Sequence, residues 1–196
     1  MRTIEIILAS ASPRRLELLR QIGIDPLVHA AEINETPLSG ESPRQFVRRM
    51  AEEKTASISA CHDNGSLVVG ADTIVVVGDQ IFGKPSNYNN ACSILQALSG
   101  KRHQVLTAVS VDSTKLKSTV LVESTVSFRE LTPEVIDAYW RTGEPLDKSG
   151  AYAIQGFAAM FIEEIQGSYS AIMGLPLYEV AELLAEAGVK VLDLDI

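Results

Sequence analysis

The chain has 196 residues and a formal net charge of −8 at pH 7, with 46% hydrophobic and 21% charged residues. These values are ordinary for a globular protein and exclude a disordered chain. The acidic balance disfavours non-specific binding to nucleic acid or to an anionic membrane, although a local basic cluster can still bind a small anion. The 2 cysteines lack metal-type spacing, so we expect reduced thiols in a cytoplasmic protein. No apolar run approaches the ~18 residues of a membrane span.

Short apolar runs and amphipathic segments alternate along the first half of the chain. Residues 67–77 form the most apolar and β-branched run, which is typical of a central strand. Pro43 after Ser42 is typical of the first position of a helix. In chain order we predict a strand at 4–9, a helix at 13–22, a loop at 31–41, a helix at 42–60, the central strand at 67–77 and a hairpin strand at 80–82.

The second half continues the alternation and contains a long hairpin. The sequence predicts a helix at 87–98, two long strands at 103–112 and 116–128, a helix at 132–140, a polar loop at 142–156, a strand at 158–165 and a last helix at 177–187. Interleaved helices and strands indicate an α/β protein, and the hairpin indicates a mixed sheet with flanking helices. We expect a single domain over residues 1–196, with two lobes around a cleft.

Two arginines follow the first predicted strand, in the run Ser10-Ala11-Ser12-Pro13-Arg14-Arg15. A helix N-terminus offers free N–H groups and the positive end of the helix dipole, which suit a phosphate. Arginines in a first turn oppose that dipole unless an anion is bound, and their planar donors fit phosphate. The run is equally consistent with Ser12 capping the helix beside two solvated arginines. It is not a P-loop of the Walker type.

Asp72 lies inside the most apolar run of the chain, between Val69 and Ile74. Burying an unpaired carboxylate costs free energy, so Asp72 needs a cation, a metal or a ligand as its partner. Acids in clefts serve as general bases or as ligands of Mg²⁺. The alternative is a break in the strand, where Gly70 opens a bulge and Asp72 caps backbone N–H groups.

Four further polar residues are weaker candidates. Taken alone, Glu35 is typical of a solvated loop acid and Lys54 of a charged helix face. Lys84 lies in the rigid turn Gly83-Lys84-Pro85, just after the strand of Asp72, and is expected to approach the same cleft. Gln155 carries a donor and an acceptor, which can bind a base edge that offers the opposite pair. An ordinary surface loop is the alternative for Gln155.

Seven short motifs are spread along the chain, within a resemblance that extends from Leu8 to Glu186. They are Ser10-x-Ser-Pro-Arg14-Arg15, Glu35-Thr36-Pro37, Glu53-Lys54, Gly70-Ala71-Asp72-Thr73, Gly83-Lys84-Pro85, Asp147-Lys148-x-Gly-x-Tyr and Gly174-Leu175-Pro176. Each is weak alone, but their order and spacing together resemble the Maf family of nucleoside triphosphate pyrophosphatases. The resemblance implies a mixed α/β fold of the inosine-triphosphatase type, with a cleft between two lobes, and a homodimer.

The resemblance also implies an activity and a set of site residues. The activity is hydrolysis of a nucleoside triphosphate to monophosphate and pyrophosphate with a divalent cation, Mg²⁺ or Mn²⁺, for house-cleaning of excess or modified nucleotides. The partner is then a nucleotide, not a stable nucleic acid or a membrane. By the same resemblance Asp72 is the proton acceptor, and Glu35 with Asp72 lies at the metal. The phosphate-binding positions are Ser10, Arg14, Arg15, Lys54 and Lys84.

Arg14, Thr73 and Gln155 stand at the positions by which the family selects its base. All three resemble the type that acts on dTTP and UTP, whereas the type that acts on 7-methyl-GTP has Trp, Gln and Glu there. The amide of Gln155 complements O4 and N3–H of uracil or thymine, while the adjacent donors of guanine suit a carboxylate. Two alternatives stay open: a 7-methyl-GTP or broader-specificity pyrophosphatase, and a nucleotide-binding regulator of cell division without turnover.

Overall fold

The computed structural model describes residues 4–62 and 65–191, which fold around a seven-stranded sheet. The single domain predicted for residues 1–196 includes residues 1–3, 63–64 and 192–196, which lie outside the described residues. The strand order is β2-β1-β3-β5-β6-β7, and β4 pairs with β3. The strands are β1 (Ile6–Leu8), β2 (Leu27–Val28), β3 (Leu67–Val77), β4 (Gln80–Phe82), β5 (Arg102–Asp112), β6 (Lys117–Phe128) and β7 (Ile162–Gln166).

The sheet is mixed, as predicted. Strand β1 is parallel to both β2 and β3, whereas the pairs β3–β4, β3–β5, β5–β6 and β6–β7 are antiparallel. The helices of the described chain are α1 (Pro13–Gln21), α2 (Pro43–Ser59), α3 (Tyr88–Leu98), α4 (Pro133–Arg141), α5 (Tyr169–Met173) and α6 (Leu177–Glu186). The five helices predicted from the sequence are confirmed to within two residues, and the two-residue strand β2 and the short helix α5 were not predicted.

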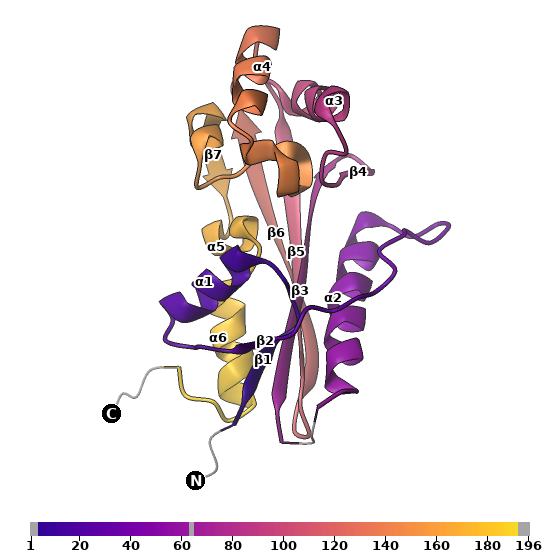
Figure 1. Ribbon diagram of the computed structural model, residues 1–196, viewed down its shortest axis with the longest axis vertical. Coiled ribbons are helices and arrows are strands. Elements are labelled where there is room, and N and C mark those ends of the chain that lie inside the picture. The colour runs from indigo at the N-terminus through magenta and orange to yellow at the C-terminus, as the bar shows by residue number, and fades with distance from the viewer. Residues whose placement is uncertain (1–3, 63–64, 192–196) are drawn as a thin grey trace.

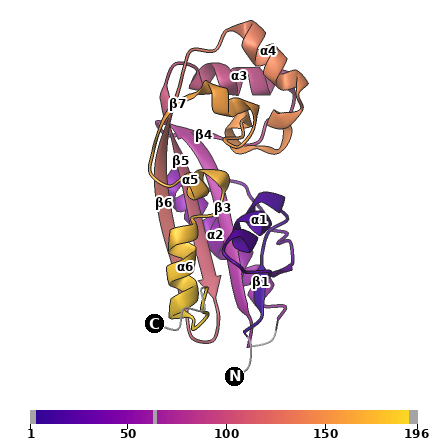
Figure 2. The same cartoon turned by 90° about the vertical axis from the view of Figure 1, so that its left-hand side faces the viewer.

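Three long strands, β3, β5 and β6, run through both ends of an elongated molecule (Figure 1). Helix α2 covers one face of the sheet, and α1, α5 and α6 lie on the other face. Helices α3 and α4 gather at the opposite end from α1 and α6, which Figure 2 shows from the side. The predicted two-lobed α/β architecture is therefore confirmed, with β3 passing from one lobe to the other.

The strand predicted at 158–165 is wrong in its first half. A 3₁₀ turn, η3 (Phe157–Phe161), occupies that half, and β7 begins only at Ile162. The side chain of Glu144 accepts the amides of Phe157 at 2.8 Å and Ala158 at 3.2 Å. These amides therefore bond to a carboxylate instead of a neighbouring strand, which the apolar pattern of the segment does not reveal.

Gly70 lets helix α2 approach strand β3 closely. A Cβ at Gly70 would lie 2.2 Å from Oγ1 of Thr55 and 3.0 Å from its backbone nitrogen. The alternative of a bulge at Gly70 is wrong, because Gly70 and Asp72 pair in regular register with β5. Residues two apart on a strand share a face, so the contact at Gly70 also brings the neighbour of Thr55, Lys54, towards Asp72.

We predict that Gly70→Ala lowers the free energy of unfolding by about 1–3 kcal/mol, because the added methyl group pushes α2 away from the sheet. Urea denaturation measures the change. Gly65→Ala is the matched control, since nothing lies within 4 Å of its Cβ position. Equal stabilities of the two variants would show that α2 is not packed this closely on β3.

Candidate active site

A cleft of about 840 Å³ lies where the turns and loops of both lobes meet β3. Its volume is within the range of small-molecule sites. Residues from the β1–α1 turn, the loop at 31–41, α2, β3, the turn after β4 and the loop at 142–156 line it. The structure brings all the candidates from the sequence to this cleft: Ser10, Arg14, Arg15, Glu35, Lys54, Asp72, Thr73, Lys84 and Gln155.

Lys54 lies between two carboxylates at the centre of the cleft. Its Nζ donates to Oδ1 of Asp72 at 2.7 Å and lies 2.7 Å from Oε1 of Glu35. The interpretation of Lys54 as part of a solvated helix face is wrong, because only 8% of the residue is exposed. The close approach of α2 to β3 buries this side of the helix. A buried ammonium of this kind is tolerated when carboxylates pair with it.

Glu35 lies at the rim of the cleft and is held as an anion. Partial burial alone would raise the pKa of its carboxyl group. The hydrogen bond and charge of Lys54, with the charges of Lys84 and Arg15, outweigh that effect and lower the pKa below its usual value. Glu35 therefore adds a second negative charge beside Asp72 at neutral pH.

Arg15 supplies a positive charge whose hydrogen bonds go to neutral groups. Its guanidinium donates to the carbonyl of Gly174 at 2.9 Å, to Oγ of Ser10 at 3.0 Å and to Oγ1 of Thr73 at 3.4 Å. Burial lowers its pKa, and the charge of Asp72 opposes that shift. Since its hydrogen bonds in the described part of the chain go to neutral oxygens, its charge stays available to an anion in the cleft.

The first turn of helix α1 faces the same cleft. Residues 11–15 line it, and Pro13 occupies the first helical turn. Ser12 occupies the N-cap position, as the alternative expected, but its side chain makes no capping hydrogen bond. The backbone of Ser12 instead donates to Oγ of Ser10 at 3.2 Å. Free N–H groups at a helix start, with Arg14 beside them, suit a phosphate group.

The segment that carries Gln155 is anchored at both ends by side chains that sequence reasoning missed. The hydroxyl of Tyr139 donates to Glu144 at 2.7 Å and accepts the amide of Ala153 at 3.2 Å. A Cβ at Gly156 would lie 1.9 Å from the carboxylate of Glu144. Gln155 is exposed between these anchors and lines the cleft.

Lys148 and Ser149 also line the cleft, although they were not chosen as site residues. The side chain of Lys148 is 15% exposed and contacts Asp147. Ser149 donates to the carbonyl of Thr73 at 3.0 Å and ties the loop to β3. The Asp147-Lys148-x-Gly-x-Tyr motif was the signal that could have identified both.

Within residues 4–62 and 65–191, no cluster of three or more His, Cys, Asp or Glu side chains could hold a metal ion by itself. Glu35 and Asp72 supply two carboxylates, and Mg²⁺ typically binds one or two carboxylates together with phosphates of the substrate. The donor set therefore fits a divalent cation that is shared with a phosphate ligand. None of the helices in the described part of the chain combines the length and the apolar character that crossing a membrane requires.

Comparison with known proteins gives consistent matches. Residues 5–187 match the model of the Maf-like protein family. The dTTP/UTP pyrophosphatase of Pseudoalteromonas atlantica is 48% identical over 185 residues, which cover 92% of this chain and 95% of the relative. That of Methylococcus capsulatus is 47% identical and covers 94% and 92%. Among solved structures, the Staphylococcus aureus Ham1 protein is 17% identical, covers 65% of this chain and 72% of its own, and has a TM-score of 0.45.

Proposed function

This chain belongs to the family of Maf-like proteins, and on that premise we propose that it hydrolyses dTTP and UTP to the monophosphate and pyrophosphate. Relatives that are 42–48% identical over most of the chain carry the name dTTP/UTP pyrophosphatase. The observation that carries the proposal is the cleft in which Lys54 joins Asp72 and Glu35 beside Arg15. Residues far apart in the sequence supply these charges. A phosphate ligand with a divalent cation uses both, because the cationic side chains bind the phosphates and the carboxylates bind the metal ion.

In the proposed reaction the cationic side chains of the cleft bind the triphosphate. A nucleoside triphosphate brings about four negative charges, which must be offset before a further nucleophile can approach phosphorus. We assign this role to Arg14, Arg15, Lys54 and Lys84, with Ser10 and the start of α1 as neutral donors. Glu35 and Asp72 would hold Mg²⁺ or Mn²⁺ together with a phosphate oxygen. When bound, that cation offsets charge on the transferring phosphoryl group and on the leaving pyrophosphate.

Asp72 is the group that we assign to the attacking water. Its side chain is 13% exposed, and the ammonium of Lys54 fixes one of its oxygens. The water oxygen bonds to the α-phosphorus, the bond from that phosphorus to the bridging oxygen of pyrophosphate breaks, and the water proton passes to Asp72. Positioning and charge supply most of the acceleration in such a reaction.

Selection of the base falls to Gln155, with Arg14 and Thr73. The Gln155 amide offers a donor for O4 and an acceptor for N3–H, so it fits uracil and thymine alike. A pocket discriminates a single methyl group by only about 1–3 kcal/mol, which is why we propose both dTTP and UTP as substrates. A homodimer in the cytoplasm, which the resemblance to the family implies, stays a prediction.

The first test is a panel of nucleoside triphosphates assayed for pyrophosphate and monophosphate with Mg²⁺, with Mn²⁺ and with a chelator. We expect dTTP and UTP to be hydrolysed with either cation and not with the chelator. Asp72→Asn should retain less than about one-tenth of the activity, because it removes the proton acceptor. Asp112→Asn, which loses a carboxylate paired with Lys117 outside the cleft, should stay active.

Other results of these assays would contradict part or all of the proposed function. Preference for 7-methyl-GTP, or equal use of many nucleotides, would replace the pyrimidine assignment. Nucleotide binding without release of pyrophosphate would favour a nucleotide-binding regulator. Full activity of Asp72→Asn would remove Asp72 from the role of proton acceptor.

We predict that Gln155→Glu lowers kcat/KM for dTTP about tenfold or more, because it replaces a donor by a negative charge at the base edge. Gln166→Glu makes the same change on β7, outside the cleft, and is the matched control. Thermal denaturation checks that both variants keep their stability. Equal dTTP kinetics in the two variants would contradict contact between Gln155 and the base.

A further inference from the structure

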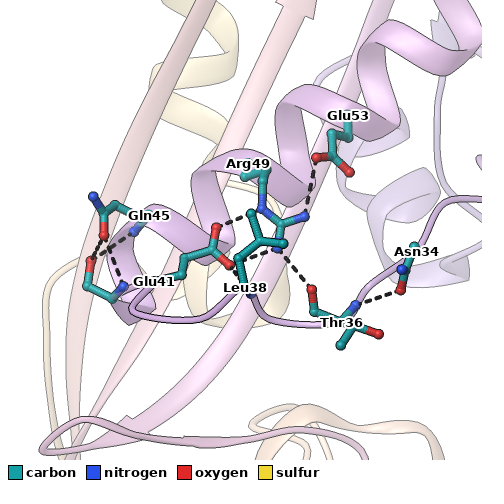
Figure 3. A network of polar contacts seen from close by, with 8 residues as sticks. Asn34, Thr36, Leu38, Glu41, Gln45, Arg49 and Glu53 are labelled. Carbon is teal, nitrogen blue, oxygen red and sulfur yellow. Dashed lines mark hydrogen bonds and ion pairs between the residues drawn. The ribbon is translucent and has the colours of Figure 1, made fainter.

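Arg49 holds the loop of Glu35 against helix α2 (Figure 3). Its Nε and Nη2 donate to the two carboxylate oxygens of Glu41, each at 2.7 Å. The same Nη2 donates to the carbonyl oxygen of Thr36 at 3.1 Å, and Nη1 donates to Glu53 at 3.2 Å. One guanidinium thus joins the two ends of the segment 36–41 to the helix. We call these contacts of Arg49 with Glu41 and Thr36 the arginine clamp.

The arginine clamp is shielded although it lies near the surface. The side chain of Glu41 is 8% exposed and that of Arg49 is 20% exposed. The hydrogen bonds from Arg49 outweigh the effect of burial and lower the pKa of Glu41 to about 2. Glu41 therefore stays ionised throughout the neutral range, and the clamp does not open at the pH of an enzyme assay.

The clamp acts on the backbone directly beside Glu35. Thr36 follows Glu35, and its own amide donates to Oδ1 of Asn34 at 3.0 Å. The residues from Asn34 to Gly40 are all exposed, so packing does little to place this part of the loop. The hydrogen bonds of Arg49 and Asn34 take over that task on either side of Glu35.

Helix α2 consequently fixes Glu35 twice. Lys54 holds the carboxylate, and Arg49, five residues earlier on the same helix, holds the backbone. Phosphates that enter the cleft compete with Glu35 for the ammonium of Lys54, whereas the contact with Arg49 lies outside the cleft and is unaffected. The contact of Arg49 with the backbone would therefore keep the carboxylate of Glu35 near Asp72 while phosphates compete for its ion pair with Lys54.

We propose that Arg49 is a positioning residue for the hydrolytic reaction and that it acts through Glu35. The inference rests on the proposed function, in which Glu35 helps to hold the divalent cation. A purely structural role would lower kcat whether or not Glu35 is present. A positioning role predicts that replacing Arg49 lowers kcat only when Glu35 is intact.

A double-mutant cycle of Arg49→Met and Glu35→Gln tests this dependence. Arg49→Met should lower kcat for dTTP about tenfold with KM little changed, because small misplacements of a reacting group are costly. In the Glu35→Gln background the same substitution should change kcat less than about twofold, since residues that act through one another are not additive. An equal loss in both backgrounds would overturn the proposal.

The matched control is Arg48→Met, which removes the same charge from the next position of α2. The polar partners of Arg48 in the described residues are the carbonyl of Thr119 at 3.0 Å and Glu52 at 4.0 Å, neither of which belongs to the loop of Glu35. Arg48→Met should leave kcat unchanged. Arg49→Lys should give an intermediate kcat, because a single ammonium does not reproduce the planar fork that reaches Glu41 and Thr36 together. If Arg49→Met loses cooperative thermal unfolding, Arg49→Lys replaces it in the double-mutant cycle.

Amide hydrogen exchange of the whole chain gives a second reading that does not depend on turnover. Arg49→Met should speed exchange in the segment 34–41 without affecting β3, while Arg48→Met should not. Unchanged exchange in that segment would overturn the proposal even if kcat falls. If the wild-type chain hydrolyses no nucleotide, the proposed function fails, and the exchange experiment still decides whether Arg49 positions the loop of Glu35.

Discussion

The ion pairs of Lys54 with Asp72 and Glu35 are the interaction on which the site depends. A buried ammonium is costly unless carboxylates pair with it, and the ammonium in turn reduces the repulsion between the two carboxylates. Three features of the chain bring these charged groups together. Gly70 admits α2 close to β3, the regular register of β3 with β5 points Asp72 at the helix, and Arg49 fixes the loop of Glu35.

Charge distribution explains how an acidic chain forms a site for an anion. The net charge of −8 is a property of the whole chain, whereas the cleft gathers Arg14, Arg15, Lys54 and Lys84. Lys54 is paired with carboxylates, but the hydrogen bonds of Arg15 go to Ser10, Thr73 and Gly174, which leave its charge in place. Local fields in a partly buried cleft outweigh the net charge, because exposed charges beyond about 10 Å are screened by salt.

Much of the fold and part of the site could be predicted from local pattern. Helix and strand periodicity gave the five long helices and β3, β5 and β6, and an acid inside an apolar strand identified Asp72. The burial of Lys54 could not be predicted, because its neighbours Glu52 and Glu53 suggest a solvated face, and the deciding contact is that of the adjacent Thr55 with distant Gly70. The 3₁₀ turn at 157–161 likewise depends on Glu144, whose role is visible only once the loop is folded.

We propose that water, oriented by Asp72, attacks the α-phosphorus while the cations hold the pyrophosphate. Hydrolysis of dTTP in H₂¹⁸O, followed by mass spectrometry of both products after a single turnover, tests it most directly. The arrangement of the cleft predicts that the heavy oxygen appears in the monophosphate and that the pyrophosphate is unlabelled. Label in pyrophosphate or in orthophosphate would mean attack at another phosphorus and would contradict the roles assigned to Asp72, Glu35 and Lys54.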